Sequence, residues 1–125
     1  MTTALQIAEK AIEIADQNPD YVYVSPINPD DDYADCVYVH DGKGSCLFGR
    51  ALMGLGVADA DYLDQNKDFR IKPLFWKMTS DGLVDFTSDD RLLSEMTIAQ
   101  MAQDNHETWA DAVATLREYP GLVKA

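Results

Sequence analysis

Apolar residues recur at helical spacing in four stretches of this chain. Residues 3–16 place alanines and isoleucines on one wide face, and the first residues of the stretch fit a capping box. Residues 46–55 are apolar on nearly every side, which is typical of a helix buried in a core. Residues 88–104 and the stretch that follows Thr108 repeat the pattern, and the short turn between them predicts an α-hairpin.

Shorter patterns predict the remaining elements. Residues 21–24 and 36–39 alternate with period two, which favours an antiparallel pair of strands with the valines packed on the helices and the tyrosines facing the other way. Residues 59–65 predict a short helix. Pro73 should prevent a continuous helix through residues 67–78.

Capping residues set the expected ends of the longer helices. Ser45 is a good N-cap for the core helix, and Gly56 should follow its last turn. Ser88 should begin the next long helix, and Asn105 is expected to end it in a left-handed conformation.

Together these patterns predict a mainly α-helical α+β fold, with about five helices and a small antiparallel β-hairpin in a single domain of residues 1–125. The length suits one domain. The longest apolar run contains Arg50 and is shorter than the roughly 20 residues that span a membrane. The N-terminal stretch has no apolar segment of the kind found in signal peptides. We therefore expect a cytoplasmic protein with reduced thiols and no membrane contact.

Acidic residues outnumber basic ones by 22 to 10, which gives a formal net charge of −12. Such a surface repels phosphate, so direct binding to nucleic acid or to an anionic membrane is disfavoured. The same charge suits a basic partner protein, including one that itself binds DNA. Solubility alone also explains a high net charge, and the sequence leaves both interpretations open.

Basic and aromatic side chains alternate within residues 67–78. Such a mixture on an irregular segment is typical of protein-binding hot spots, although aromatics packed under a loop with cations extended to solvent give the same pattern. Arg50, the only charge on the core helix, either forms a structural salt bridge or lines a pocket for an anion. The residues predicted to bind a partner are Lys67, Phe69, Arg70, Lys72, Phe75, Trp76 and Arg50.

Cys46 is the best candidate for a catalytic nucleophile. It would stand in the first turn of the core helix, where the helix dipole and free amides lower the pKa of a thiol. A strand, a turn and a cysteine that opens a buried helix also resemble the arrangement in papain-like cysteine peptidases. The base would have to be His40 or His106. Because cysteine is often fully buried, core packing also explains Cys46.

The turn between His40 and Arg50 suggests a further possibility. Its Gly-Lys-Gly-Ser sequence resembles an anion-binding turn, but it matches neither a Walker A loop nor a dinucleotide fingerprint. The two cysteines and two histidines could bind zinc, although their spacing fits no common structural site. Four aspartates within residues 30–35 could hold calcium, without the glycine and glutamate of an EF-hand. No cofactor is predicted.

Two segments resemble small uncharacterised proteins from actinobacteria and their bacteriophages. CLFGRALMGLGV, at residues 46–57, is similar to a recurring cysteine-glycine-arginine-alanine-leucine helix followed by leucine-glycine-valine. AQMAQDNHETWADAV, at residues 99–113, is similar to their glutamine-aspartate-turn-tryptophan-alanine pattern. Gln100, Gln103 and Asp104 in the second segment are expected to cap or bridge backbone near Trp109. The resemblance implies a phage accessory or host-modulating protein, or its bacterial counterpart, and no assigned activity.

The sequence thus leads to one function and two alternatives. The leading prediction is a small acidic, non-enzymatic module that binds a protein partner, which is a host protein if the chain is phage-encoded. The first alternative is a cysteine-dependent hydrolase or transferase that uses Cys46 with His40 or His106. The second is binding of a small anion or a metal at the turn from His40 to Arg50.

Overall fold

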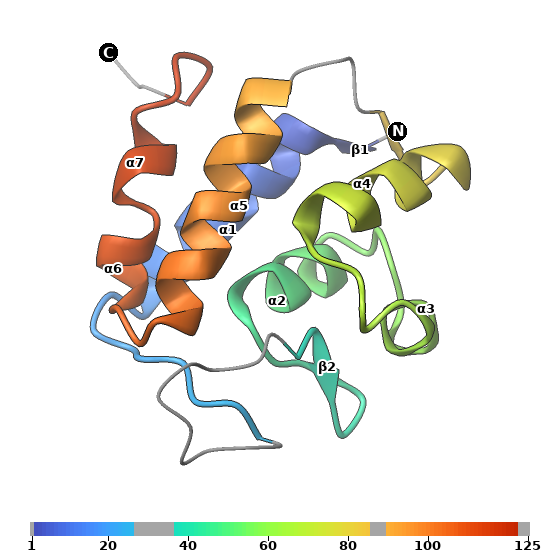
Figure 1. The fold of residues 1–125 in the computed structure, drawn as a ribbon, viewed down its shortest axis with the longest axis horizontal. Coiled ribbons are helices and arrows are strands. Elements are labelled where there is room, and N and C mark those ends of the chain that lie inside the picture. Colours follow the sequence, from blue (N-terminus) through green and yellow to red (C-terminus); the bar gives the residue numbers. More distant parts are fainter. Residues whose placement is uncertain (1, 27–36, 86–89, 123–125) are drawn as a thin grey trace.

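The computed structural model describes residues 2–26, 37–85 and 90–122. Helices predominate within them, which confirms the predicted mainly helical α+β class (Figure 1). The helices are α1 (Ala4–Gln17), α2 (Leu47–Gly54), α3 (Ala60–Gln65), α4 (Ile71–Ser80), α5 (Asp90–Asp104), α6 (Trp109–Ala112) and α7 (Ala114–Arg117). The strands are β1 (Thr2–Thr3), β2 (Val39–His40), β3 (Lys43–Gly44) and β4 (Val84–Asp85).

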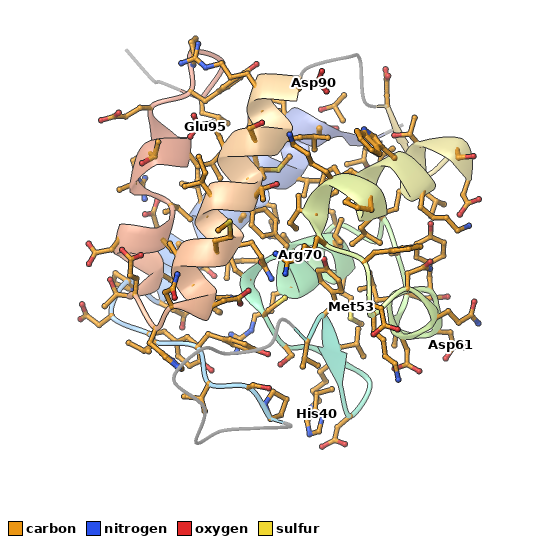
Figure 2. The ribbon with its side chains drawn as sticks, viewed as in Figure 1. His40, Met53, Asp61, Arg70, Asp90 and Glu95 are labelled. Atoms are coloured by element: carbon orange, nitrogen blue, oxygen red, sulfur yellow. The ribbon has the colours of Figure 1, made fainter. Side chains whose placement is uncertain are left out.

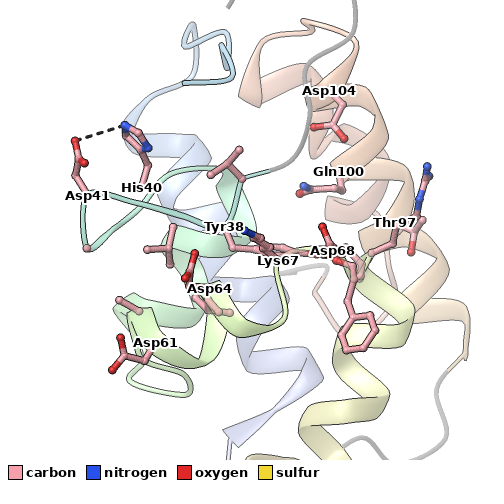
Figure 3. A pocket seen from close by; sticks show the side chains of 18 of the residues that line it. Tyr38, His40, Asp41, Asp61, Asp64, Lys67, Asp68, Thr97, Gln100 and Asp104 are labelled. Carbon is pink, nitrogen blue, oxygen red and sulfur yellow. Dashed lines mark hydrogen bonds and ion pairs between the residues drawn. The ribbon is translucent and has the colours of Figure 1, made fainter. Parts of the chain in front are cut away.

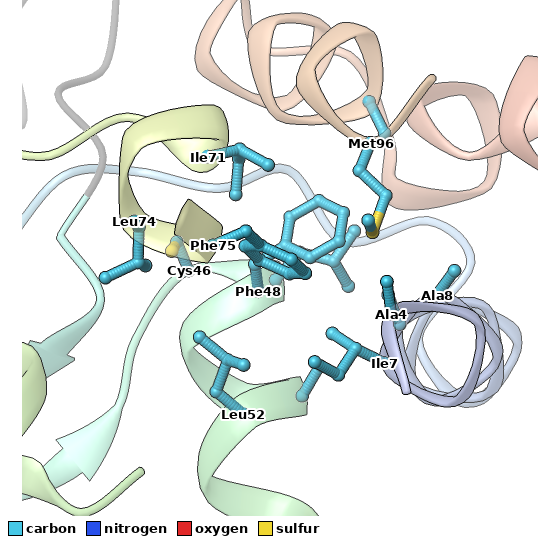
Figure 4. Close-up of a cluster of buried hydrophobic side chains, with 14 of the residues drawn as sticks. Ala4, Ile7, Ala8, Cys46, Phe48, Leu52, Ile71, Leu74, Phe75 and Met96 are labelled. Carbon is cyan, nitrogen blue, oxygen red and sulfur yellow. The ribbon is translucent and has the colours of Figure 1, made fainter. Parts of the chain in front are cut away.

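The core lies between α1 and α2 on one side and α4 and α5 on the other. Side chains from all four helices meet there, including Ile7, Phe48, Phe75 and Met96 (Figure 4). Helix α5 also packs against α6 and α7, which lie along its other flank (Figure 1). No helix among the described residues is long and apolar enough to cross a membrane.

The β-structure consists of two short pairs. Strands β2 and β3 form an antiparallel hairpin whose turn residues, Asp41 and Gly42, both have positive φ, as an Asp-Gly turn favours. Strand β1 pairs with β4 in parallel. The predicted pairing of residues 21–24 with residues 36–39 is wrong, because Val22 forms an isolated antiparallel bridge with Thr108 instead.

The predicted orientation of the valines and tyrosines is also wrong. Tyr23 and Tyr38 are buried, whereas Val22 and Val24 are exposed. A tyrosine ring buries more apolar surface than a valine side chain does. Its burial is favourable when the hydroxyl finds a hydrogen-bond partner. The Tyr38 hydroxyl meets this condition because it donates to the Phe69 carbonyl at 2.7 Å.

The capping signals place most helix ends correctly. Gln6 N–H donates to Thr3 Oγ1 at 3.2 Å, and Thr3 N–H donates to Gln6 Oε1 at 2.9 Å, which confirms the capping box of α1. Helix α2 has Cys46 as its N-cap, one residue after the predicted Ser45. Gly56 follows the end of α2 with φ of 70°, as predicted.

Two expectations about helix boundaries are corrected. No continuous helix runs through residues 67–78, as predicted, but residues 71–80 form α4 where an irregular segment was expected. Pro73 is the third residue of this helix, where the missing N–H has no acceptor in the helix to lose. His106, with φ of 64°, occupies the left-handed position after α5 in place of Asn105. The predicted N-cap Ser88 lies outside the described residues.

Candidate functional site

A cleft of about 770 Å³ opens beside the β2–β3 hairpin (Figure 3). The hairpin forms one wall, α3 and the loop that leads into α4 form the second, and the C-terminal half of α5 forms the third. A volume of this size lies within the range of sites that bind small ligands or side chains of a partner. The cleft is therefore the candidate functional site.

Two glycines fix the position of the hairpin wall. A Cβ atom on Gly49 of α2 would lie 2.0 Å from the Tyr38 carbonyl oxygen, and one on Gly44 would lie 2.7 Å from Arg50 Cα. Only residues without a side chain allow the hairpin backbone to approach α2 so closely. The sequence thus sets the place of Tyr38 and its neighbours in the cleft wall.

The α5 wall presents Thr97, Gln100 and Asp104, which recur at helical spacing and line the cleft (Figure 3). Gln100 is 6% exposed and Asp104 is 7% exposed, so a carboxylate and an amide lie almost buried in this wall. Gln103 Nε2 donates to Asp104 Oδ1 at 3.1 Å. The Asp104 carboxylate is therefore oriented from within the protein.

Gln103 is itself held by two further hydrogen bonds. Its Oε1 accepts from Leu47 N–H at 2.8 Å and from Trp109 Nε1 at 3.2 Å. Gln103 bonds to backbone as expected, but the backbone group belongs to the start of α2 and not to the junction with the Trp109 helix, where Gln103 bonds to the indole instead. Because Gln103 is fully buried, one amide connects α2, α5 and α6 to the cleft wall.

Three of the predicted binding residues lie in the second wall. Lys67, Phe69 and Arg70 all line the cleft. Phe69 is 40% exposed, and Met101 of α5, which the sequence prediction missed, is 44% exposed in the same cleft. Two accessible apolar side chains therefore lie among the charged residues of the cleft.

The other members of the predicted basic and aromatic segment lie elsewhere. Phe75 is fully buried, so its assignment to a binding surface is wrong. Because residues 71–80 are helical, Phe75 faces the core together with Leu74 and Met78. Lys72 and Trp76 are outside the lining of the cleft, and Trp76 is 55% exposed on α4.

Acidic side chains outnumber basic ones around the cleft. The lining includes two permanent cations, Lys67 and Arg70, and five aspartates: Asp41, Asp61, Asp64, Asp68 and Asp104. His40 Nε2 lies 3.4 Å from Asp41 Oδ2 at the outer end of the hairpin (Figures 2 and 3). The local field is therefore negative, like the net charge of the whole chain.

Arg50 is stacked on aromatic rings outside the cleft. Its guanidinium carbon lies 4.8 Å from the centre of the Trp109 ring and 5.4 Å from that of Tyr21. Its Nε donates to the Ser45 carbonyl at 3.2 Å. No described carboxylate lies within ion-pair distance, so cation–π contacts take the place of the predicted salt bridge in the described part of the chain.

The candidate catalytic residues lie in different environments. Cys46 is fully buried (Figure 4). Gln100 Nε2 lies 3.7 Å from its sulfur. His40 is exposed at the hairpin, and His106 Nδ1 lies 3.2 Å from the Tyr23 carbonyl oxygen. Burial of Cys46 fits a packing role for its thiol.

The backbone amides of the turn before α2 are bound within the protein. Ser45 N–H donates to the Tyr38 carbonyl, Cys46 N–H to the Val37 carbonyl, and Leu47 N–H to Gln103 Oε1. These are the amides that an anion at this turn would need.

In residues 2–26, 37–85 and 90–122, no three His, Cys, Asp or Glu side chains gather as a metal site requires. Cys36 and the four aspartates of residues 30–35 lie outside these ranges.

Comparison of the chain with protein-family models, with curated proteins and with solved structures finds no match.

Within α5, the sequence prediction missed four cleft residues as binding residues: Thr97, Gln100, Met101 and Asp104. The available signal was that three polar residues recur on the side of α5 that also carries Leu93 and Met96, where a core-facing helix is normally apolar. Polar side chains at such positions indicate either a buried network or a site, and α5 contains both.

Proposed function

We propose that this protein is a non-enzymatic binding module that holds a basic segment of a partner protein in the cleft. The observation that supports this most strongly is the composition of the lining, in which five aspartates and two cations surround two accessible apolar side chains. A basic peptide with an apolar residue complements such a surface in both charge and shape.

The apolar side chains of the cleft would contribute binding affinity that exposed charges alone cannot supply. Exposed ion pairs contribute little to affinity because water and salt screen them, so specific binding needs desolvated contacts. Phe69 and Met101 lie at the cleft with 40% and 44% of their surface exposed. Aromatic and methionine side chains are enriched at interfaces, where the flexible methionine adapts to its partner.

The net charge narrows the class of partner. With 22 acidic and 10 basic residues, the chain repels the phosphates of nucleic acids, and the cleft is itself acidic. A protein partner with a basic segment is therefore the best match. The resemblance to proteins of actinobacteria and their phages leads us to place this partner in the bacterial cytoplasm, as a host protein if the chain is phage-encoded.

Screening a randomised library of short peptides against the purified protein tests the proposal. We expect the bound peptides to be enriched in arginine or lysine together with an apolar residue. Phe69→Ala and Met101→Ala should each weaken binding of a selected peptide by about tenfold, as loss of an interface anchor does.

Trp76→Ala and Ile98→Ala are the matched controls, because both side chains are exposed to a similar degree outside the cleft. These controls should bind the selected peptide like the unmodified protein. A library without basic binders, or equal weakening by Trp76→Ala, would overturn the proposal.

A further inference from the structure

We infer that the bound segment is extended and adds a strand to the outer edge of β2, where its backbone bonds to the backbone of Val39. The inference rests on the proposed function and deepens it, because it states the form in which the basic segment is recognised. It depends on the directions of the backbone groups in the hairpin.

The pairing of the hairpin directs the backbone groups of Val39 away from β3. His40 pairs with Lys43 across the two-residue turn. On the other side of Val39, Ser45 N–H donates to the Tyr38 carbonyl at 2.9 Å. In an antiparallel pair, positions bonded across the ladder alternate with positions whose N–H and C=O point outward. Val39 therefore presents one donor and one acceptor at the outer edge of β2.

This edge is open, whereas the other edge of the hairpin is covered. Within the part of the chain that the structure describes, neither the N–H nor the carbonyl of Val39 forms a hydrogen bond. On the β3 side, a Cβ atom on Gly44 would lie 2.7 Å from Arg50 Cα, so α2 occupies that side. Unpaired backbone groups at a strand edge are a template for another strand. In this hairpin, β2 provides that template.

The open edge of β2 runs along the cleft. Residues 37–40 all belong to the cleft lining, and Figure 3 shows Tyr38 and His40 in this wall. Successive side chains of a strand point to opposite faces, so consecutive residues line one cavity where that cavity follows the strand edge. A segment that enters the cleft can therefore reach Val39 with its own backbone.

The charge around this edge selects a basic segment. Bonds to the backbone give affinity to an added strand, and the surfaces beside it select among its alternate side chains. Lysine or arginine side chains of the segment would meet the four exposed aspartates of the lining, and its apolar side chains would meet Phe69 and Met101. The four exposed aspartates are Asp41, Asp61, Asp64 and Asp68.

Backbone methylation of a bound peptide tests the inference. The probe is the basic peptide from the library that binds most tightly, and each of its residues is N-methylated in turn. A methyl group removes the N–H and fills the space on that side of the backbone. Every second N–H of an added strand faces β2, so we expect affinity losses of at least about tenfold at alternate residues of the bound stretch and of no more than about threefold between them.

Two variants locate the contact on the protein. Val39→Pro removes the outward N–H and takes no bond from the hairpin, since a strand tolerates proline where the N–H points away from its partner. It should bind the probe about tenfold more weakly than the matched control Val39→Ala, which loses the same valine side chain and keeps the N–H.

The methylation scan uses the unmodified protein, so it decides the question even if Val39→Pro does not fold. A scan without alternation, or equal binding by two folded variants, would overturn the inference. If basic peptides bind and their scan does not alternate, the inference fails and the proposed function stands. If no basic peptide binds, both fail.

Discussion

Gln103 caps α2 from a position 56 residues further along the chain: its Oε1 accepts from Leu47 N–H at 2.8 Å. The first amides of a helix lack partners within it and usually bond to a side chain of the N-cap residue. Here α5 supplies the acceptor, and the same amide bonds to Trp109 and to Asp104. The folded position of α2 and the geometry of the cleft wall therefore depend on one side chain.

The first prediction concerns this side chain. Gln103→Leu should lower the free energy of unfolding by about 2–4 kcal/mol, because it leaves Leu47 N–H and Trp109 Nε1 buried without their acceptor. Urea denaturation monitored by tryptophan fluorescence and circular dichroism measures the change. The control Gln65→Leu, at an exposed position, should change stability by no more than about 0.5 kcal/mol. Similar losses in the two variants would contradict this role of Gln103.

The second prediction compares two glycines of one helix. Gly49→Ala should destabilise the protein by about 1–3 kcal/mol, because its Cβ would meet Tyr38 backbone and push the hairpin from α2. Gly54→Ala should leave stability unchanged or raise it by up to about 1 kcal/mol, since its Cβ would meet only the end of the Lys10 side chain, at 3.2 Å. Thermal melts of both variants suffice, and a stable Gly49→Ala protein would refute the close packing.

The third prediction concerns the buried thiol. In a Cys36→Ser variant, which leaves Cys46 as the one thiol, alkylation of the native protein should be at least about a hundredfold slower than in urea. The reason is that full burial of Cys46 makes labelling depend on opening of the structure. Intact mass spectrometry over time gives both rates. Fast labelling of the native protein would contradict the packing role of Cys46 and favour the cysteine-dependent enzyme instead.

The fourth prediction concerns the pH dependence of the link between α3 and α4. The Lys77 ammonium and then the Tyr62 hydroxyl, each 2.8 Å from Asp81 Oδ2, lower the pKa of the Asp81 carboxyl. A pKa that is lower in the folded state gives stability above the unfolded value, and this stability is lost as the pH falls through the folded value. The melting temperature should therefore exceed that of Asp81→Asn at neutral pH, and the difference should vanish well below the ordinary carboxyl pKa of about 3.9.

Two further variants separate the causes of this pH dependence. Lys77→Gln should remove most of the difference between Asp81 and its asparagine variant, and Tyr62→Phe should remove less, since the bond from Lys77 is the larger cause. A difference that persists at acidic pH would show that Asp81 acts through packing instead of charge.

Local signals in the sequence predict the helices well. The capping box of α1, the nearly all-apolar character of α2 and the glycine after it each depend on residues close together in the chain, so a local pattern reveals them. Pro73 misled the prediction because its effect depends on its position in the helix, and that position is set by the start of α4. Tyr23 and Tyr38 misled it because their hydroxyls find partners far along the chain.

The cleft was only partly predictable, because some of its residues are brought together by contacts between distant parts of the chain. Lys67, Phe69 and Arg70 were identified from composition, because basic and aromatic residues in one segment are a local feature. The α5 wall comes from a helix that lies much later in the chain. Its position relative to α2 depends on the bond from Leu47 N–H to Gln103 Oε1, which no local sequence pattern reveals. Phe75 was misassigned because helical periodicity, once Pro73 is accommodated, turns it toward the core.

The methyl signal of Met101 tests the central claim most directly. Titration of methionine-methyl-labelled protein with the tightest basic peptide from the library should shift the Met101 signal, because that side chain lines the cleft with 44% of its surface exposed. The signal of Met78, which is fully buried in α4, should stay in place and serves as the reference. A peptide that saturates the protein and leaves Met101 unchanged would contradict binding in this cleft.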